Sequence, residues 1–191
     1  RVISYNGEIY NYVELADQLR GLGARFTTSS DTEVLLESWL NWGPQALDRF
    51  DGMFAFALFD QGKLHLATDP FGEKPMYLVE TAEGIYFSSE PHPLVEMLGL
   101  TPEFSGGNVA EFLSQGYLSA PSTGYKNLVR MEPATHLTFT LDTEGVSRKY
   151  WLPSTPEPHS GRVREISERD LDRIVETLAE SLKIRFRADV T

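Results

Sequence analysis

The stretch MFAFALFD at residues 53–60, followed by QGKLHLAT at residues 61–68, determines the fold class of this chain. The run from Met53 to Phe59 is too apolar to alternate, so it predicts a strand that is buried on both faces. A turn with Gly62 follows, and residues 64–68 then predict a second strand. The two strands together predict an antiparallel hairpin inside a larger sheet.

Further strands and helices are expected on both sides of this hairpin. Upstream, residues 1–5 predict a strand, and apolar residues at helical spacing predict helices over 12–22 and 31–42. Downstream, we expect strands at 75–80 and 84–89, short helices at 91–98 and 108–115, and a hairpin at 134–141 and 145–151. Runs of strands with helices segregated between them indicate an α+β fold, in which helices cover antiparallel sheets.

Composition excludes several classes of protein. The 191 residues are 41% apolar and 24% charged, a globular balance. The 17 Lys and Arg against 28 Asp and Glu give a net charge of −11, which argues against binding to nucleic acid or to an anionic membrane surface. No apolar run is long enough for a membrane span. The sequence starts at Arg1 without an initiator Met, so we expect the natural N-terminus to lie upstream.

The chain has no cysteine, which excludes a disulfide, a thiolate metal site and a cysteine nucleophile within these residues. The four histidines are scattered, and none has a second ligand at metal spacing, so we expect no metal site. No glycine-rich loop with the Lys-Ser/Thr of a phosphate-binding motif occurs either.

The first candidate for chemistry is Asn6-Gly7-Glu8, within SYNGEIYNY at residues 4–12. An Asn amide beside a Gly backbone N–H offers two donors for an oxyanion, which forms when an amide carbonyl is attacked. Glu8 adds a carboxylate that could receive a substrate ammonium. The structural alternative is a plain Asn-Gly turn between a strand and a helix, which the dipeptide alone favours.

The second candidate is Asp31, within TSSDTEV at residues 28–34. Ser30 as N-cap and Glu33 three residues later predict a capping box at the start of a helix. If Ser30 is the cap, the Asp31 carboxylate is free to bind a cation. If Asp31 is itself the cap, its role is structural, and the segment alone favours this second interpretation.

A proline-rich stretch at 152–161 has the composition of a linker. After it, Ser167 and Asp170 predict the capping box of a long helix with an apolar stripe. We therefore divide the chain into a domain at 1–151, a linker at 152–166 and the beginning of a further domain at 167–191.

Taken together and in order, these motifs resemble one family. The strings NGEIYNY, SDTEVLL, DGMFAFALFD, DPFGEKPMY and FSSE are similar to the glutaminase domain of glutamine-hydrolysing asparagine synthetases. The string QGYLSAPSTGYKNLVRMEPATHLTF at residues 115–139, with Tyr150-Trp151 after it, resembles the segment that closes this domain. RFRADVT, at residues 185–191, resembles the beginning of the ATP-dependent synthetase domain.

The resemblance implies an N-terminal-nucleophile fold, a four-layer αββα sandwich of two antiparallel sheets between helices, here without its N-terminal strands. It also implies that an N-terminal cysteine, upstream of this chain, attacks the side-chain amide of glutamine with its own α-amine as base. The ammonia released then serves an ATP-dependent domain that makes asparagine from aspartate, with glutamate, AMP and pyrophosphate as the other products.

Carried over residue by residue, the resemblance assigns Asn6 and Gly7 to the oxyanion hole and Glu8 and Asp31 to the α-amino end of glutamine. The segments taken alone favour a plain turn at Asn6-Gly7 and a capping role for Asp31, and the resemblance favours substrate binding at both places instead. It implies no cofactor in this domain, with ATP and Mg in the synthetase domain. The implied partners are L-glutamine and that downstream domain, and neither nucleic acid nor a membrane is expected. The resemblance implies a cytoplasmic enzyme, and a homodimer is possible.

The chain departs from the family pattern at three places. Thr68 stands where Arg commonly precedes the aspartate, Met76-Tyr77-Leu78 replaces Leu-Tyr-Tyr, and Ser88 replaces the Ala of Phe-Ala-Ser-Glu. Three alternatives therefore stay open: a different amidated acceptor, a glutaminase that serves a sugar-phosphate or phosphoribosyl amidotransferase, and a non-catalytic scaffold that has lost the nucleophile.

Overall fold

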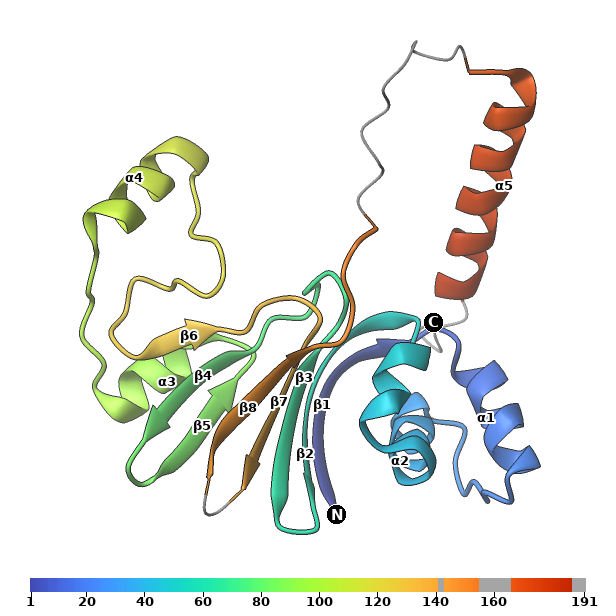
Figure 1. The fold of residues 1–191 in the computed structure, drawn as a ribbon, viewed down its shortest axis with the longest axis horizontal. Coiled ribbons are helices and arrows are strands. Elements are labelled where there is room, and N and C mark those ends of the chain that lie inside the picture. Colours follow the sequence, from blue (N-terminus) through green and yellow to red (C-terminus); the bar gives the residue numbers. More distant parts are fainter. Residues whose placement is uncertain (141–142, 155–165, 187–191) are drawn as a thin grey trace. The chain divides into compact units, whose positions relative to one another are not determined.

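A computed structural model describes residues 1–140, 143–154 and 166–186 (Figure 1). The chain forms two compact units. The first consists of Arg1–Gly7 and Met53–Trp151, and the second of Glu8–Gly52 and the described residues from Leu152 onward. This division follows compactness and does not coincide with the segments 1–151, 152–166 and 167–191, which stay predictions. Residues 155–165, most of the expected linker, lie outside the described residues.

Two sheets dominate the described strands. The five-stranded sheet has the order β1 (Val2–Ile9), β2 (Gly52–Asp60), β3 (Lys63–Thr68), β7 (Thr135–Thr140) and β8 (Thr143–Lys149), and the three-stranded sheet has the order β5 (Gly84–Ser88), β4 (Tyr77–Thr81) and β6 (Leu128–Arg130). The predicted hairpin is confirmed: β2 and β3 pair antiparallel, with Ala55 opposite Thr68 and Asp60 opposite Lys63.

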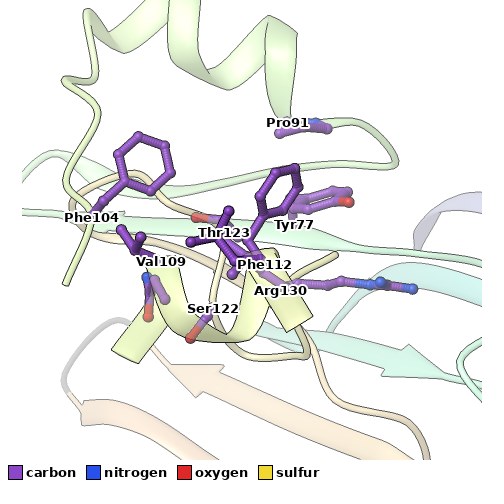
Figure 2. Close-up of a pocket in the computed structure, with 11 residues that line it drawn as sticks. Tyr77, Pro91, Phe104, Val109, Phe112, Ser122, Thr123 and Arg130 are labelled. Carbon is purple, nitrogen blue, oxygen red and sulfur yellow. The ribbon is translucent and has the colours of Figure 1, made fainter. Parts of the chain in front are cut away.

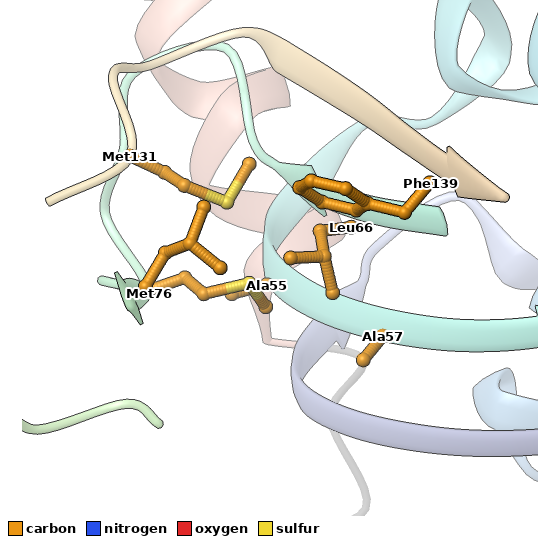
Figure 3. Close-up of a cluster of buried hydrophobic side chains, with 7 residues drawn as sticks. Ala55, Ala57, Leu66, Met76, Met131 and Phe139 are labelled. Atoms are coloured by element: carbon orange, nitrogen blue, oxygen red, sulfur yellow. The ribbon is translucent and has the colours of Figure 1, made fainter. Parts of the chain in front are cut away.

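One core cluster of the first unit joins residues from both sheets, and Figure 3 shows its side chains. Small residues of β2 and Leu66 of β3 meet Met76, Leu78 and Met131, which come from the three-stranded sheet and the segments next to it. The reason is the period of two along a strand, which sends Ala55 and Ala57 toward this core and Phe54 and Phe56 to the opposite face. β2 is therefore buried on both faces from Phe54 to Leu58, as its apolar run predicts, whereas Phe59 at its end is 50% exposed.

Helices accompany both units. In the first, α3 (Pro91–Leu98) packs Leu94 against Val79 and Leu128 of the three-stranded sheet, whereas α4 (Gly106–Gln115) has no buried residue. The second unit contains α1 (Tyr12–Gly21), α2 (Asp31–Trp42), the 3-10 helix η1 (Gly43–Arg49) and α5 (Glu168–Arg185). The capping box of Ser167 and Asp170 at the start of α5 is confirmed.

The main differences from the expected elements concern β1, η1 and β6. β1 continues to Ile9, four residues beyond its expected end, so the Asn-Gly turn is wrong. The 3-10 helix and the short strand β6 were not expected, because neither has a run of periodic apolar residues long enough to indicate it. With these changes the α+β class is confirmed.

Candidate functional site

Asn6 and Gly7 lie inside β1 and not in a turn. A Cβ atom on Gly7 would fall on the carbonyl oxygen of Met53 and 2.6 Å from the Cα of Phe54, so only glycine allows β2 to approach this closely. The Asn6 side chain is exposed, and no hydrogen bond to another described residue engages its amide. Asn6 therefore offers an amide donor that no described hydrogen bond uses. It lies next to Gly7, where a larger residue would collide with β2.

A pocket of about 250 Å³ opens beside Asn6 in the first unit. β1 and β2 form one wall, and the end of β5 and the segment before β4 form the other. The lining residues are Ser4, Tyr5, Asn6, Ala55, Pro75, Met76, Phe87, Ser88 and Ser89. The pocket is large enough to hold an amide group, and Asn6 is one of the residues that line it.

Ser30, and not Asp31, caps α2. The Ser30 backbone is extended, and its hydroxyl accepts the Thr32 N–H at 3.1 Å. The capping-box prediction is wrong in its second half, because the Glu33 carboxylate does not return to the N-cap. It accepts hydrogen bonds from the backbone N–H and hydroxyl groups of Thr27 and Thr28, and these bonds, first of all the one from the Thr28 side chain, lower the pKa of Glu33 to about 2. The Glu33 carboxylate thus holds Thr27 and Thr28 in the segment before α2.

The Asp31 carboxylate connects the first turn of α2 to the end of β1. Its Oδ2 accepts the backbone N–H of Ile9 at 3.0 Å, which brings Asp31 next to the residue that follows Glu8. Glu8 is half-buried, and within the described part of the chain no ion pair or hydrogen bond engages its side chain. Each of these two carboxylates attracts a cation. Asn6 and Gly7 belong to the first unit, and Glu8 and Asp31 to the second, so each pair is described in its own unit.

Asp69, in the DPFGEK segment, organises the connection between β3 and β4 although it was not predicted as a key residue. It is completely buried. Its carboxylate accepts four backbone N–H groups, from Phe54, Phe71, Glu73 and Lys74, at 2.9–3.2 Å. The signal was present in the sequence, because an aspartate before Pro-x-Gly commonly accepts hydrogen bonds from the backbone that follows it.

Tyr150 and Trp151 fix the end of the first unit to this same segment. The Tyr150 hydroxyl donates to the carbonyl oxygen of Thr68 at 2.6 Å, and the Trp151 ring meets the Phe71 ring edge-on at a centroid distance of 5.2 Å. The Tyr-Trp pair thus closes the first unit by binding to the connection that Asp69 organises.

Two buried histidines lie on neighbouring strands of the five-stranded sheet. His65 on β3 and His136 on β7 stack at a centroid distance of 5.3 Å, with Nδ1 and Nε2 3.2 Å apart. Burial lowers the pKa of His136 to about 4, and it also lowers the pKa of His65. The rings therefore stay neutral at pH 7. None of the predicted site residues contacts them in the described hydrogen bonds.

A second, larger pocket of about 550 Å³ lies between α4 and the three-stranded sheet (Figure 2). Apolar side chains such as Phe104, Val109 and Phe112 line it together with Tyr77 and Arg130, and no predicted site residue does. In the described part of the chain, no group of three or more His, Cys, Asp or Glu side chains could hold a metal ion. Among the described helices, none is long and apolar enough to cross a membrane.

Comparison with known sequences identifies relatives over nearly the whole chain. Residues 1–151 match the model of a family described as the glutamine amidotransferase domain. Asparagine synthetase [glutamine-hydrolyzing] 1 of Bacillus subtilis is 30% identical over 98% of this chain and 29% of its own length. Asparagine synthetase [glutamine-hydrolyzing] 3 of the same organism is 34% identical over 78% of this chain and 25% of its own length. The chain thus spans less than a third of the length of these relatives.

Solved structures share the fold. Glutamine phosphoribosylpyrophosphate amidotransferase of Bacillus subtilis superposes with a TM-score of 0.58 over 79% of this chain and 29% of its own, at 21% identity. A structure described as the allosteric regulatory enzyme of purine biosynthesis gives a TM-score of 0.57 over 79% of this chain and 28% of its own, also at 21% identity. At this identity the likeness concerns the fold alone, and it agrees with the expected N-terminal-nucleophile architecture.

Proposed function

Because the chain belongs to the glutamine amidotransferase domain family, we propose that it is the glutaminase part of an enzyme that releases ammonia from glutamine and uses it to make asparagine. The observation that carries this proposal is the family match over residues 1–151, together with asparagine synthetase relatives that align over the chain. ATP and Mg²⁺ would act in a synthetase part outside this chain, with aspartate as the acceptor.

In this proposal, Asn6 and Gly7 stabilise the oxyanion that forms when the glutamine amide is attacked. The exposed Asn6 amide is available for this role, and Gly7 leaves its backbone N–H without a side chain beside it. Loss of one such donor raises the barrier by about 3 kcal/mol in other acyl-transfer enzymes. Glu8 and Asp31 would hold the α-ammonium of the substrate, because two carboxylates compensate its charge.

The nucleophile must come from outside these residues, since the chain has no cysteine. We assign it to a cysteine at the mature N-terminus of the full-length protein. Attack on the amide carbon would give a γ-glutamyl thioester and ammonia, and water would then release glutamate and restore the thiol.

The test is an assay of glutamate release from glutamine by the full-length protein. We expect glutamate and, with aspartate and ATP, asparagine in equal amounts. The 191-residue polypeptide without further residues is the negative control, and we expect no glutamate from it. Full-length protein that folds but releases no glutamate would support the non-catalytic scaffold, and glutamate release without asparagine would indicate a different acceptor.

A further inference from the structure

Ser89 places a hydroxyl group in the wall of the pocket that contains Asn6. It follows the last residue of β5, so it comes from the three-stranded sheet, whereas Asn6 comes from β1 of the five-stranded sheet. Its side chain is exposed, and within the part of the chain that the structure describes no hydrogen bond engages its hydroxyl. This hydroxyl is therefore available to a bound molecule.

A primary amide needs partners of two kinds. Its oxygen accepts hydrogen bonds, and its nitrogen donates two. Asn6 and Gly7 can donate to the oxygen but cannot accept from the nitrogen through the same groups. Donors on β1 therefore leave the amide nitrogen in need of an acceptor elsewhere in the pocket.

The lining of the pocket leaves few candidates for that acceptor. The side chains of Ala55, Pro75, Met76 and Phe87 offer no strong acceptor, and the Tyr5 hydroxyl belongs to β1, the strand that carries the oxyanion donors. The Ser88 hydroxyl already accepts the backbone N–H of Glu90 at 3.2 Å. Ser4 lies two residues before Asn6 on the same strand, so it occupies the wall that already carries the oxyanion donors. Ser89 is the hydroxyl on the opposite wall.

We propose that Ser89 Oγ accepts a hydrogen bond from the amide nitrogen of bound glutamine, opposite the Asn6 and Gly7 donors. This inference rests on the proposed glutaminase function and deepens it, because it names the group that recognises the leaving nitrogen. A serine hydroxyl suits both stages of the reaction: it accepts an N–H from the amide, and it can still accept one from the ammonia that departs.

The test compares two substrates that differ only at the leaving group. L-Glutamine releases ammonia as its leaving group, whereas L-glutamate γ-methyl ester releases methanol and has no N–H at that position. With the full-length protein, Ser89→Ala should lower kcat/KM for glutamine about tenfold and change kcat/KM for the ester less than twofold. Ser89→Thr keeps the hydroxyl and should restore at least half of the glutamine activity.

Ser114→Ala is the matched control. It removes an exposed hydroxyl on α4 that donates to the carbonyl oxygen of Glu111 at 2.9 Å and does not line the Asn6 pocket, and it should change kcat/KM less than twofold for either substrate. An equal loss with both substrates in Ser89→Ala would show a structural role and overturn the proposal, as would an unchanged glutamine activity. A failure of Ser89→Thr to restore activity would also count against it.

If the wild-type protein hydrolyses neither substrate, the glutaminase function itself fails and the role of Ser89 fails with it. Hydrolysis of glutamine without the selective loss refutes Ser89 alone.

Discussion

Asp31 lies at the start of α2, where its neighbour Ser30 and not Asp31 itself caps the helix. Ser30 supplies the cap and Glu33 holds Thr27 and Thr28, so the Asp31 carboxylate is left to accept the Ile9 N–H with Oδ2. The helix N-terminus favours an anion at this place, because its N–H groups carry partial positive charge. Asp31 thus combines a hydrogen bond to Ile9 with a negative charge at the start of α2.

This arrangement predicts a separation of stability from activity in Asp31→Asn. Asparagine keeps an oxygen that can accept the Ile9 N–H, so the free energy of unfolding should change by less than about 1 kcal/mol. The substrate ammonium would lose a charged partner, and kcat/KM for glutamine should fall about 10- to 100-fold, since charge-assisted hydrogen bonds contribute about 1.5–3 kcal/mol. Asparagine synthesis from free ammonia should persist. Urea unfolding and the two activity assays on the full-length protein measure these quantities.

Asp17→Asn is the control for Asp31→Asn. Asp17 also lies in the second unit, and within the described residues its carboxylate forms a single exposed ion pair, with Arg20 at 2.6 Å. The same chemical change there should leave both activities and stability nearly unchanged. Normal glutamine kinetics in Asp31→Asn, or a joint loss of the glutamine- and ammonia-dependent activities, would refute Asp31 as a substrate ligand.

At this scale the sequence predicts the cap of α2 but not the contacts between residues far apart in the chain. Ser30 as the cap could be predicted, because Ser before an apolar-periodic run is a strong signal. The bond from Ile9 to Asp31 could not, because it joins residues 22 positions apart and depends on where β1 ends. The position of Ser89 beside Asn6 likewise depends on how the two sheets meet.

Among the elements, β3 and β7 carry a feature that makes stability depend on pH. An unfolded histidine titrates near pH 6.5, whereas burial holds the pKa of His136 at about 4 in the folded chain. Between these values the unfolded chain binds more protons than the folded one, so the free energy of unfolding falls as the pH falls.

We therefore expect His136→Gln to make stability less sensitive to acid. The wild type should lose about 2–3 kcal/mol more than the variant between pH 7 and pH 4.5, as measured by urea unfolding at each pH. Glutamine at this position can still hydrogen-bond with its neighbours but does not titrate. His92→Gln is the control, because the His92 side chain is 74% exposed. Identical pH profiles for the wild type and His136→Gln would show that the pair does not titrate as described.

The elements themselves could largely be predicted, and the errors have physical causes. The hairpin of β2 and β3 is indicated by an apolar run and a Gly turn, which are local signals. Asn6 and Gly7 have local preferences for a turn, yet pairing with β2 keeps them extended, and the close approach at Gly7 fits this. Tertiary contact thus decides against the local preference. The short strand β6 depends on its pairing with β4, which no local signal indicates.

For the whole molecule, the boundary after Trp151 stays a prediction that proteolysis can test. Tyr150 and Trp151 are bound to the segment at Thr68 and Phe71, and the proline-rich composition follows directly. We expect limited proteolysis of the full-length protein to cut between residues 152 and 166 before it cuts within the strands. Mass spectrometry of the early fragments identifies the site.

A variant that lacks the contact between Trp151 and Phe71 serves as the comparison in this proteolysis experiment. Trp151→Ala removes the ring that packs on Phe71, so it should also allow early cleavage closer to Thr68. Early cleavage of the wild type within residues 53–140, with 152–166 intact, would show that the boundary is misplaced.

The buried carboxylate of Asp69 has a consequence for the motion of the first unit. Four amide groups that belong to no common helix or strand share one pair of oxygens, and one of them lies on β2. Breaking any one of these four hydrogen bonds would expose part of the buried Asp69 carboxylate, so we expect all four to break together. In deuterated water, the N–H groups of Phe71, Glu73 and Lys74 should therefore exchange as slowly as the sheet that holds Phe54, although an irregular connection ordinarily exchanges within seconds. The connection between β3 and β4 would then unfold only when the sheet does.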